Sequence, residues 1–308
     1  MPLHPAIQEL LTAMAESGAP PLHELSPADA RAGTDALVAL GGDGAEVAAQ
    51  AEREIGGVRA AVYTPQGDPG PGGRWPVLVW IHGGGWVICS PETHAAVARD
   101  LCAGAGCIVV SLDYRLAPEH KAPAAAEDCR AAVAWLLEHA AELGGDPERV
   151  AVGGDSAGGN LAALMAIEFG RRLVFQLLVY PVTDLTGSSP SIVENGTGYF
   201  LEKASMDWFT AHYLDGSGIA PDDPRVSPAF ASDEQLAATP PAFVVTAEFD
   251  PLRDEGEAYA ERLRSLGVET TSRRFDGMIH AFYGFQLLVP ESVDAIRQSA
   301  ELLSKAFA

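Results

Sequence analysis

The amino-acid sequence predicts an α/β fold: a mostly parallel, eight-stranded sheet with helices on both faces. Three observations lead to this prediction. From Pro76 onward, short continuous apolar runs alternate with helical stretches, which is typical of βαβ units with buried parallel strands. Before Pro76, two segments of alternating polarity flank Gly56 and Gly57 and predict an antiparallel hairpin that opens the sheet. About 60 residues separate the run ending near Tyr180 from the run beginning near Ala242, and this unusual length predicts an insertion.

The individual elements follow from the hydrophobic periodicity. Parallel strands are expected at 77–81, 107–112, 149–153, 175–180, 242–247 and 268–275. Helices are expected at 94–105, 122–142, 157–169, 252–266 and 287–307. Two more helices should precede the sheet: an amphipathic one at 6–16, with Leu10, Leu11 and Met14 on its apolar face, and an Ala-rich one at 27–40. Trp208, Phe209 and Tyr213 indicate a further helix inside the insertion.

The composition predicts one globular domain over residues 1–308 and excludes several kinds of partner. Apolar residues make up 47% of the chain, which is enough to bury a large core. Twenty Lys and Arg face 42 Asp and Glu, so the net charge is −22. Because this charge repels phosphate backbones and anionic lipid surfaces, we expect neither a nucleic acid nor a membrane partner.

The cysteines and the chain start predict a cytoplasmic protein without a metal site. Cys89, Cys102, Cys107 and Cys129 form no C-x-x-C pair, and no histidine cluster has zinc-ligand spacing. The start has no basic region followed by an apolar one, and no run of 18 apolar residues occurs. The glycosylation sequon at Asn195 therefore receives no functional weight.

A serine motif lies at the end of one predicted strand. Gly154-Asp155-Ser156-Ala157-Gly158 fits G-x-S-x-G, directly after the strand at 149–153 and directly before a helix. In such a sharp turn the residues two before and two after the serine come close together, so both must lack a Cβ. The turn exposes Ser156 Oγ and places the Ala157 N–H at a helix N-terminus, where it faces a developing anion. The sequence therefore predicts an α/β-hydrolase fold with Ser156 as nucleophile.

A glycine-rich loop follows the first parallel strand. His82-Gly83-Gly84-Gly85-Trp86 matches the HGGG-type oxyanion motif, in which successive glycines let backbone N–H groups approach a carbonyl oxygen. His82 itself is expected to be a structural hydrogen-bonding residue.

The base and the acid follow from chain order, because this fold places Ser, then Asp or Glu, then His. Only His212 and His280 follow the serine, and His280 lies in a loop before the last helix, so we expect it to be the base. Asp250 comes three residues after a strand and is the expected acid, with Glu248 and Asp254 as alternatives.

The motifs HGGGW, GDSAGG, DPLRDEG and GMIHAF, in this order, span most of the chain, which resembles the hormone-sensitive-lipase-like family of microbial carboxylesterases. The resemblance implies a helical cap formed by about residues 1–45 and an insertion at about 183–228, a structural ion-pair network around 113–119, and a homodimer. It also implies the triad and the oxyanion hole, which are Ser156, Asp250, His280 and the N–H groups of Gly84, Gly85 and Ala157. Ala281 departs from the family pattern, since many relatives have glycine there.

These features predict a serine carboxylesterase that needs no cofactor or metal ion and acts on a small-molecule ester with a short to medium acyl chain. Four aromatic side chains are expected to line the substrate pocket: Trp86, Trp208, Phe209 and Phe282. Hydrolysis of amides, carbamates or lactones remains an alternative, because all share one tetrahedral intermediate. The gibberellin receptors of plants resemble the same family without hydrolysing esters, but such receptors lack the catalytic histidine that His280 supplies here.

Overall fold

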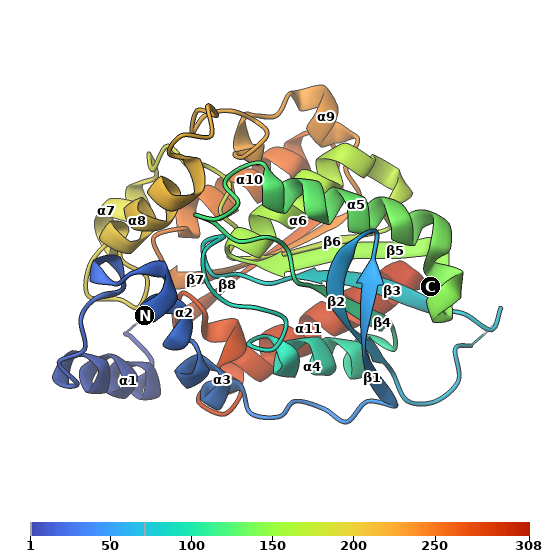
Figure 1. The fold of residues 1–308 in the computed structure, drawn as a ribbon, viewed down its shortest axis with the longest axis horizontal. Coiled ribbons are helices and arrows are strands. Elements are labelled where there is room, and N and C mark those ends of the chain that lie inside the picture. Colours follow the sequence, from blue (N-terminus) through green and yellow to red (C-terminus); the bar gives the residue numbers. More distant parts are fainter. Residues whose placement is uncertain (1, 71) are drawn as a thin grey trace.

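A computed structural model of the chain describes residues 2–70 and 72–308 and has the predicted architecture, an eight-stranded sheet between two layers of helices (Figure 1). The sheet has the order β1-β2-β4-β3-β5-β6-β7-β8. Its strands are β1 Ala49–Ile55, β2 Val58–Thr64, β3 Trp75–Ile81, β4 Ile108–Leu112, β5 Gly145–Asp155, β6 Gln176–Val179, β7 Ala242–Phe249 and β8 Thr270–Ile279. The predicted hairpin is confirmed, since β1 pairs antiparallel with β2 and β2 antiparallel with β4, whereas all other pairs are parallel.

Eleven helices occur in the described part of the chain. They are α1 Pro5–Glu16, α2 Pro27–Ala32, α3 Asp35–Gly41, α4 Ala95–Ala105, α5 Ala124–His139, α6 Ala157–Phe169, α7 Pro190–Asn195, α8 Lys203–Leu214, α9 Asp233–Ala237, α10 Arg253–Ser265 and α11 Pro290–Phe307. Helices α4 and α11 cover one face of the sheet, and α5, α6 and α10 cover the other (Figure 1).

Each face of the sheet has its own hydrophobic core, because successive side chains of a strand point to opposite faces. In β3, Val77, Val79 and Ile81 belong to the core beneath α5, α6 and α10, whereas Leu78 and Trp80 belong to the core beneath α4 and α11. All five side chains are fully buried. This two-sided burial explains why the strand appears in the sequence as a continuous apolar run.

The structure corrects the expected helix at 27–40. It contains two short helices instead, because α2 ends at Ala32 and Gly33 caps it with hydrogen bonds to Asp29 and Ala30. The Thr34 hydroxyl then donates to Arg31 O (2.8 Å) before α3 begins. Glycine is a poor helix former, so the break falls at a residue that disfavours the helix interior. Two further helices that the periodicity did not indicate lie between β6 and β7: α7 within the insertion and α9 after it.

Several chain segments outside the layers lie at the carboxyl edge of the parallel strands. Helices α1, α2, α7 and α8 lie together on this side of the molecule (Figure 1), and the turn Leu22–Glu24 contacts α8. This edge is where ligands bind in open α/β sheets.

Among the described residues, no helix is long and apolar enough to cross a membrane, and no group of three or more His, Cys, Asp or Glu residues could hold a metal ion. The four cysteines are all unpaired, and three of them are buried.

Candidate active site

Ser156 occupies a strained turn between β5 and α6. Its φ is 55° and its ψ is −119°, which a non-glycine residue adopts only when the surrounding structure imposes it. The surrounding structure leaves no room for side chains on either side: a Cβ on Gly154 would meet Gly158 C at 2.5 Å, and a Cβ on Gly158 would meet His82 O at 2.6 Å. The two motif glycines thus permit the close approach that the turn requires.

The structure brings the three expected triad side chains together. The Ser156 Oγ to His280 Nε2 distance is 2.9 Å, and the His280 Nδ1 to Asp250 Oδ2 distance is 2.7 Å. Because an ionised carboxylate can only accept, Nδ1 carries the ring hydrogen and Nε2 is left to accept the hydroxyl proton. Asp250 is fully buried, and its other oxygen accepts from the Leu252 N–H (2.8 Å). The Tyr180 ring lies 4.5 Å from the imidazole and supports it from the side.

The two alternative acids have other partners. Glu248 accepts from the Gly277 N–H (2.7 Å). Asp254 accepts from the Ser191 N–H (2.9 Å) and pairs with Arg253 (2.8 Å). Neither carboxylate is hydrogen-bonded to His280, so the geometry favours Asp250.

Asn195, the residue of the glycosylation sequon, supports the loop of the acid, a role that no sequence pattern indicates. Asn195 ends α7, is 2% exposed, and its Nδ2 donates to Asp250 O (3.2 Å) and Glu248 O (3.3 Å). The side chain thus attaches the insertion to the loop that carries Asp250. Such a buried amide is no acceptor for a glycan in the folded chain.

The glycine-rich loop after β3 leaves backbone donors available beside the serine. In the described part of the chain, the N–H groups of Gly84, Gly85 and Ala157 donate to no protein acceptor. Gly84 O accepts from both Val87 N–H (3.0 Å) and Ile88 N–H (2.9 Å), which closes the loop into a tight turn. Gly84 and Gly85 have φ of 102° and 57°, so the turn favours glycine at both positions.

Backbone strain in the described chain concentrates around this site. Five non-glycine residues have positive φ: Trp86 (61°), Cys89 (71°), Ser156 (55°), Tyr180 (33°) and Ala281 (70°). All five lie beyond the carboxyl ends of β3, β5, β6 or β8. Strained residues of this kind cluster at functional sites because the surrounding packing must hold them in place. The φ of Ala281 also shows why glycine suits that position.

The four expected pocket residues have different surroundings. Trp86 is 2% exposed and stacks on Tyr213, with centroids 4.3 Å apart. Phe209 packs directly against Gly85, and Trp208 contacts the Phe209 ring edge-on at 5.2 Å. Phe282 is fully buried against Phe275 and Tyr180. The expectation for Phe282 is therefore corrected: its ring belongs to the core behind His280, not to an open wall.

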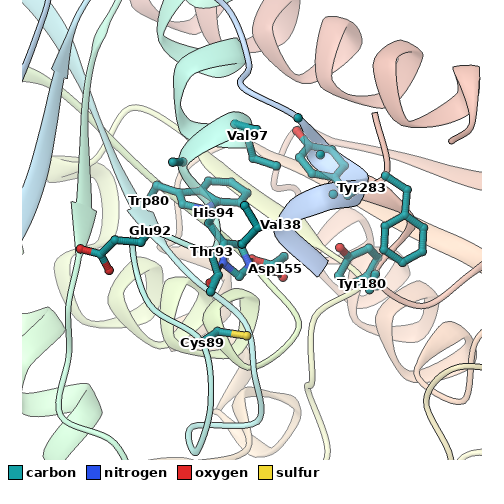
Figure 2. A pocket seen from close by; sticks show the side chains of 17 residues that line it. Val38, Trp80, Cys89, Glu92, Thr93, His94, Val97, Asp155, Tyr180 and Tyr283 are labelled. Carbon is teal, nitrogen blue, oxygen red and sulfur yellow. Dashed lines mark hydrogen bonds and ion pairs between the residues drawn. The ribbon is translucent and has the colours of Figure 1, made fainter. Parts of the chain in front are cut away.

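A cavity of about 80 Å³ lies between α3, the start of α4 and the loop after β8 (Figure 2). Its lining includes residues that adjoin the triad in the sequence, Asp155 and Ala281, and the rings of Trp80, Tyr180 and Tyr283. Val38 and Gly41 of α3 close it from the N-terminal side. Sequence reasoning did not find this cavity, because its walls come from six separate stretches of the chain.

His82 has the structural role that the sequence predicts. It is fully buried, its Nδ1–H donates to Gly83 O (2.7 Å), and its ring stacks on Tyr114 at 4.3 Å. Burial, together with the nearby His94, lowers the pKa of His82 to about 3. The ring is therefore neutral at physiological pH.

Glu255 and Asn160 hold the base of the insertion. Glu255 Oε1 accepts from the N–H groups of Thr183 (2.7 Å) and Asp184 (3.1 Å). Asn160, one turn after the nucleophile, donates through Nδ2 to Val182 O (2.9 Å) and Val226 O (2.8 Å). The two ends of the insertion are thus fixed to α6 and α10.

Replacing Glu255 with glutamine should change how stability depends on pH. Burial raises the pKa of Glu255 from 4.5 to about 8, although the two backbone N–H groups oppose the shift. Between these values the folded state keeps a proton that the unfolded chain releases. The free energy of unfolding of the wild type should therefore fall by up to about 1.4 kcal/mol per pH unit over this range, and no further above pH 8.

Glutamine keeps the accepting oxygen and cannot ionise, so Glu255→Gln should gain stability relative to the wild type from pH 5 to pH 8. Urea unfolding at each pH measures the difference in the free energy of unfolding between the two proteins. The contributions of the other titrating groups cancel in this difference. Parallel pH curves for the two proteins would show that Glu255 is already ionised in the folded state.

Comparisons with known proteins agree with this geometry. A family model described as the alpha/beta hydrolase fold matches residues 78–284. The carboxylic ester hydrolase LipN of Mycobacterium tuberculosis is 47% identical over 242 residues, which covers 75% of this chain and 63% of LipN. The carboxylesterase NlhH of the same organism is 45% identical over 235 residues, which covers 75% of this chain and 74% of NlhH. A hyperthermophilic esterase from the archaeon Pyrobaculum calidifontis superposes with a TM-score of 0.91 at 38% identity, over 100% of both chains.

The sheet order and the serine turn define the chain as an α/β hydrolase. Within that class, it belongs to the hormone-sensitive-lipase-like family of carboxylesterases.

Proposed function

We propose that the protein hydrolyses carboxylic esters with short to medium acyl chains through an acyl-enzyme formed on Ser156. The observation that carries the proposal is the continuous chain of hydrogen bonds from Asp250 through His280 to Ser156, at 2.7 and 2.9 Å. This series of hydrogen bonds begins at the buried Asp250 carboxylate and ends at the Ser156 hydroxyl, which lies next to unpaired backbone donors. Acyl transfer needs this arrangement.

In the proposed mechanism, Ser156 Oγ attacks the ester carbonyl carbon while His280 Nε2 takes the hydroxyl proton. The imidazolium then gives this proton to the departing alkoxide, and Asp250 stabilises its charge without being protonated. Water attacks the acyl-enzyme with His280 again as base, and the acid product leaves. The N–H groups of Gly84, Gly85 and Ala157 hydrogen-bond to the oxyanion in both steps. The mechanism uses no cofactor and no metal ion.

Residues 1–45 and 183–228 would form a cap over this site. Phe209 of the insertion packs on Gly85. From the N-terminal side, Arg31 donates to Val87 O (2.8 Å) and Ala117 O (2.9 Å) and pairs with Glu119 (2.7 Å). Glu119 lies in the segment 113–119 for which the resemblance implies ion pairs, and at the start of that segment Asp113 pairs separately with Arg59 (2.7 Å). These contacts attach both cap segments to the core next to the glycine-rich loop.

A series of p-nitrophenyl esters from acetate to palmitate tests the acyl preference. Each methylene that is buried contributes about 0.8 kcal/mol, until the cavity is full and further carbons must clash or return to water. Because the cavity holds only about 80 Å³, kcat/KM should peak at short to medium chains and fall steeply for palmitate. Comparable kcat/KM for palmitate and butyrate would contradict the proposal.

Narrowing the cavity should shift the preference further toward short chains. Val38 lies on the cavity wall in α3, so Val38→Phe should reduce kcat/KM for hexanoate and octanoate more than for acetate. Val193 in α7 offers a matched control, since its side chain is 89% exposed and lies outside the cavity. An equal response of Val38→Phe and Val193→Phe across the ester series would place the acyl chain elsewhere.

The same proposal places the enzyme in the cytoplasm, as a homodimer that binds neither membranes nor nucleic acid. Four unpaired cysteines are typical of a reducing compartment. The net charge of −22 disfavours anionic surfaces. Sedimentation velocity measures the assembly state directly.

A further inference from the structure

Asp155, the residue directly before the nucleophile, joins the serine turn to the glycine-rich loop. Its carboxylate Oδ1 accepts from the Gly83 N–H (3.0 Å). Gly83 directly precedes Gly84 and Gly85, whose N–H groups are unpaired in the described chain. On its other side lies His94, whose Nε2 is 3.2 Å from Oδ1 and 3.3 Å from Oδ2. Figure 2 shows the two side chains next to each other in the wall of the cavity.

The hydrogen bonds around His94 favour the doubly protonated ring. Nδ1 lies 2.9 Å from Thr93 Oγ1. That hydroxyl donates its own hydrogen to Ser90 O (2.8 Å), so it can only accept from the ring. Nε2 faces a carboxylate, which also only accepts. A neutral imidazole could satisfy one of these two acceptors, whereas the imidazolium satisfies both.

The charges around the pair agree with this assignment. The side chains of His94 and Asp155 are 15% and 11% exposed. Burial alone lowers the pKa of His94, but the charge and hydrogen bond of Asp155 raise it above its ordinary value overall. Burial likewise raises the pKa of Asp155, and His94 reverses the effect. Of the other groups near the pair, His82 is neutral, Glu92 pairs with Arg59, and the phenols of Tyr180 and Tyr283 stay protonated.

We propose that His94 is a positioning residue: as an imidazolium it holds the Asp155 carboxylate against the Gly83 N–H, and thereby fixes the donors of Gly84 and Gly85. The inference rests on the proposed oxyanion hole. A buried carboxylate without its cation would take up a proton or turn toward water, and either change weakens its hold on the loop. The loop donors act on the charge that develops in the transition state, so their displacement affects kcat more than substrate binding.

A double-mutant cycle tests the proposal with p-nitrophenyl butyrate. Asp155→Ala removes the acceptor and should lower kcat about 10- to 100-fold with little change in KM, as expected for misplaced transition-state contacts. His94→Gln should lower kcat by a smaller factor. Since His94 acts through Asp155, the double variant should match Asp155→Ala alone. The inhibition constant of a trifluoromethyl ketone, which forms a hemiketal oxyanion, should rise in parallel with the loss in kcat/KM.

His139→Gln is the matched control. His139 is paired with Glu142 (3.2 Å) but is 46% exposed at the end of α5, and its replacement should leave kcat unchanged. Titration of active sites with a phosphonate normalises each variant for folded enzyme. If Asp155→Ala fails to fold, the cycle uses Asp155→Asn, which keeps the accepting oxygen and removes the charge. In the Asp155→Asn background, His94→Gln should cause no further loss in kcat.

Multiplicative losses in the double variant, or a rise in KM at constant kcat, would overturn the role of His94. These outcomes are distinct from failure of the proposed function, which would appear first as a wild-type enzyme that does not hydrolyse the ester.

Discussion

Replacing Ser156 with alanine should lower kcat for p-nitrophenyl acetate by about 10⁶-fold, the size of effect expected when a serine nucleophile is removed. In the wild type, the Ser156 hydroxyl lies 2.9 Å from His280 Nε2. In the variant, His280 has no hydroxyl from which it could take a proton. Only the slow rate that comes from substrate binding and the backbone donors remains. Steady-state kinetics at saturating ester measure the loss directly.

Ser299 provides a control of the same chemistry. Its side chain is fully buried, and its hydroxyl donates to Ala295 O (2.8 Å) within α11, not to a triad residue. Ser299→Ala should keep kcat near the wild-type value. A Ser156→Ala enzyme with more than a small fraction of wild-type turnover would exclude Ser156 as the nucleophile.

Replacing Asp250 with asparagine should lower kcat by about 10⁴-fold. The carboxylate accepts the Nδ1 hydrogen of His280 at 2.7 Å and so keeps Nε2 free to accept. An amide can instead present its own hydrogens to Nδ1, which favours the tautomer with hydrogen on Nε2. That tautomer cannot take the Ser156 proton. The loss should appear in kcat and in the burst rate of acylation, with the fold unchanged by circular dichroism.

The neighbouring carboxylates separate the role of Asp250 from a general effect of negative charge. Glu248 and Asp254 lie within four residues of it in the sequence, and each has its own hydrogen-bond partners. Glu248→Gln and Asp254→Asn should each reduce kcat far less than Asp250→Asn. If one of them caused the larger loss, that residue would be the acid.

The strands and the serine turn could be predicted because their causes are local. The run at 77–81 is apolar at every position because β3 is buried on both faces, and the two glycines around Ser156 are required by contacts within one turn. The helix boundaries in the first 45 residues were harder to predict from the sequence. Gly33 ends α2, but a single glycine within an Ala-rich stretch also occurs inside helices.

Only the triad of the candidate site could be predicted, because its three residues occur in a known order along the chain. Ser156, Asp250 and His280 follow from motif, strand end and the small number of histidines after the serine. The roles of Asp155, His94 and Asn195 depend on contacts across 72, 61 and 55 positions of sequence, respectively. The hydrophobic periodicity of the sequence does not predict contacts between residues so far apart. Likewise, no sequence pattern shows that the chain turns the Phe282 ring into the core.

The central claim is that Ser156 is a nucleophile activated through His280 and Asp250, and covalent labelling tests it most directly. A p-nitrophenyl alkylphosphonate should release one equivalent of p-nitrophenol per chain and leave the phosphonyl group on Ser156, as peptide mass spectrometry would show. The labelling rate should fall sharply in Asp250→Asn, and no label should enter Ser156→Ala. Labelling of another residue, or undiminished ester hydrolysis by fully labelled enzyme, would contradict the account.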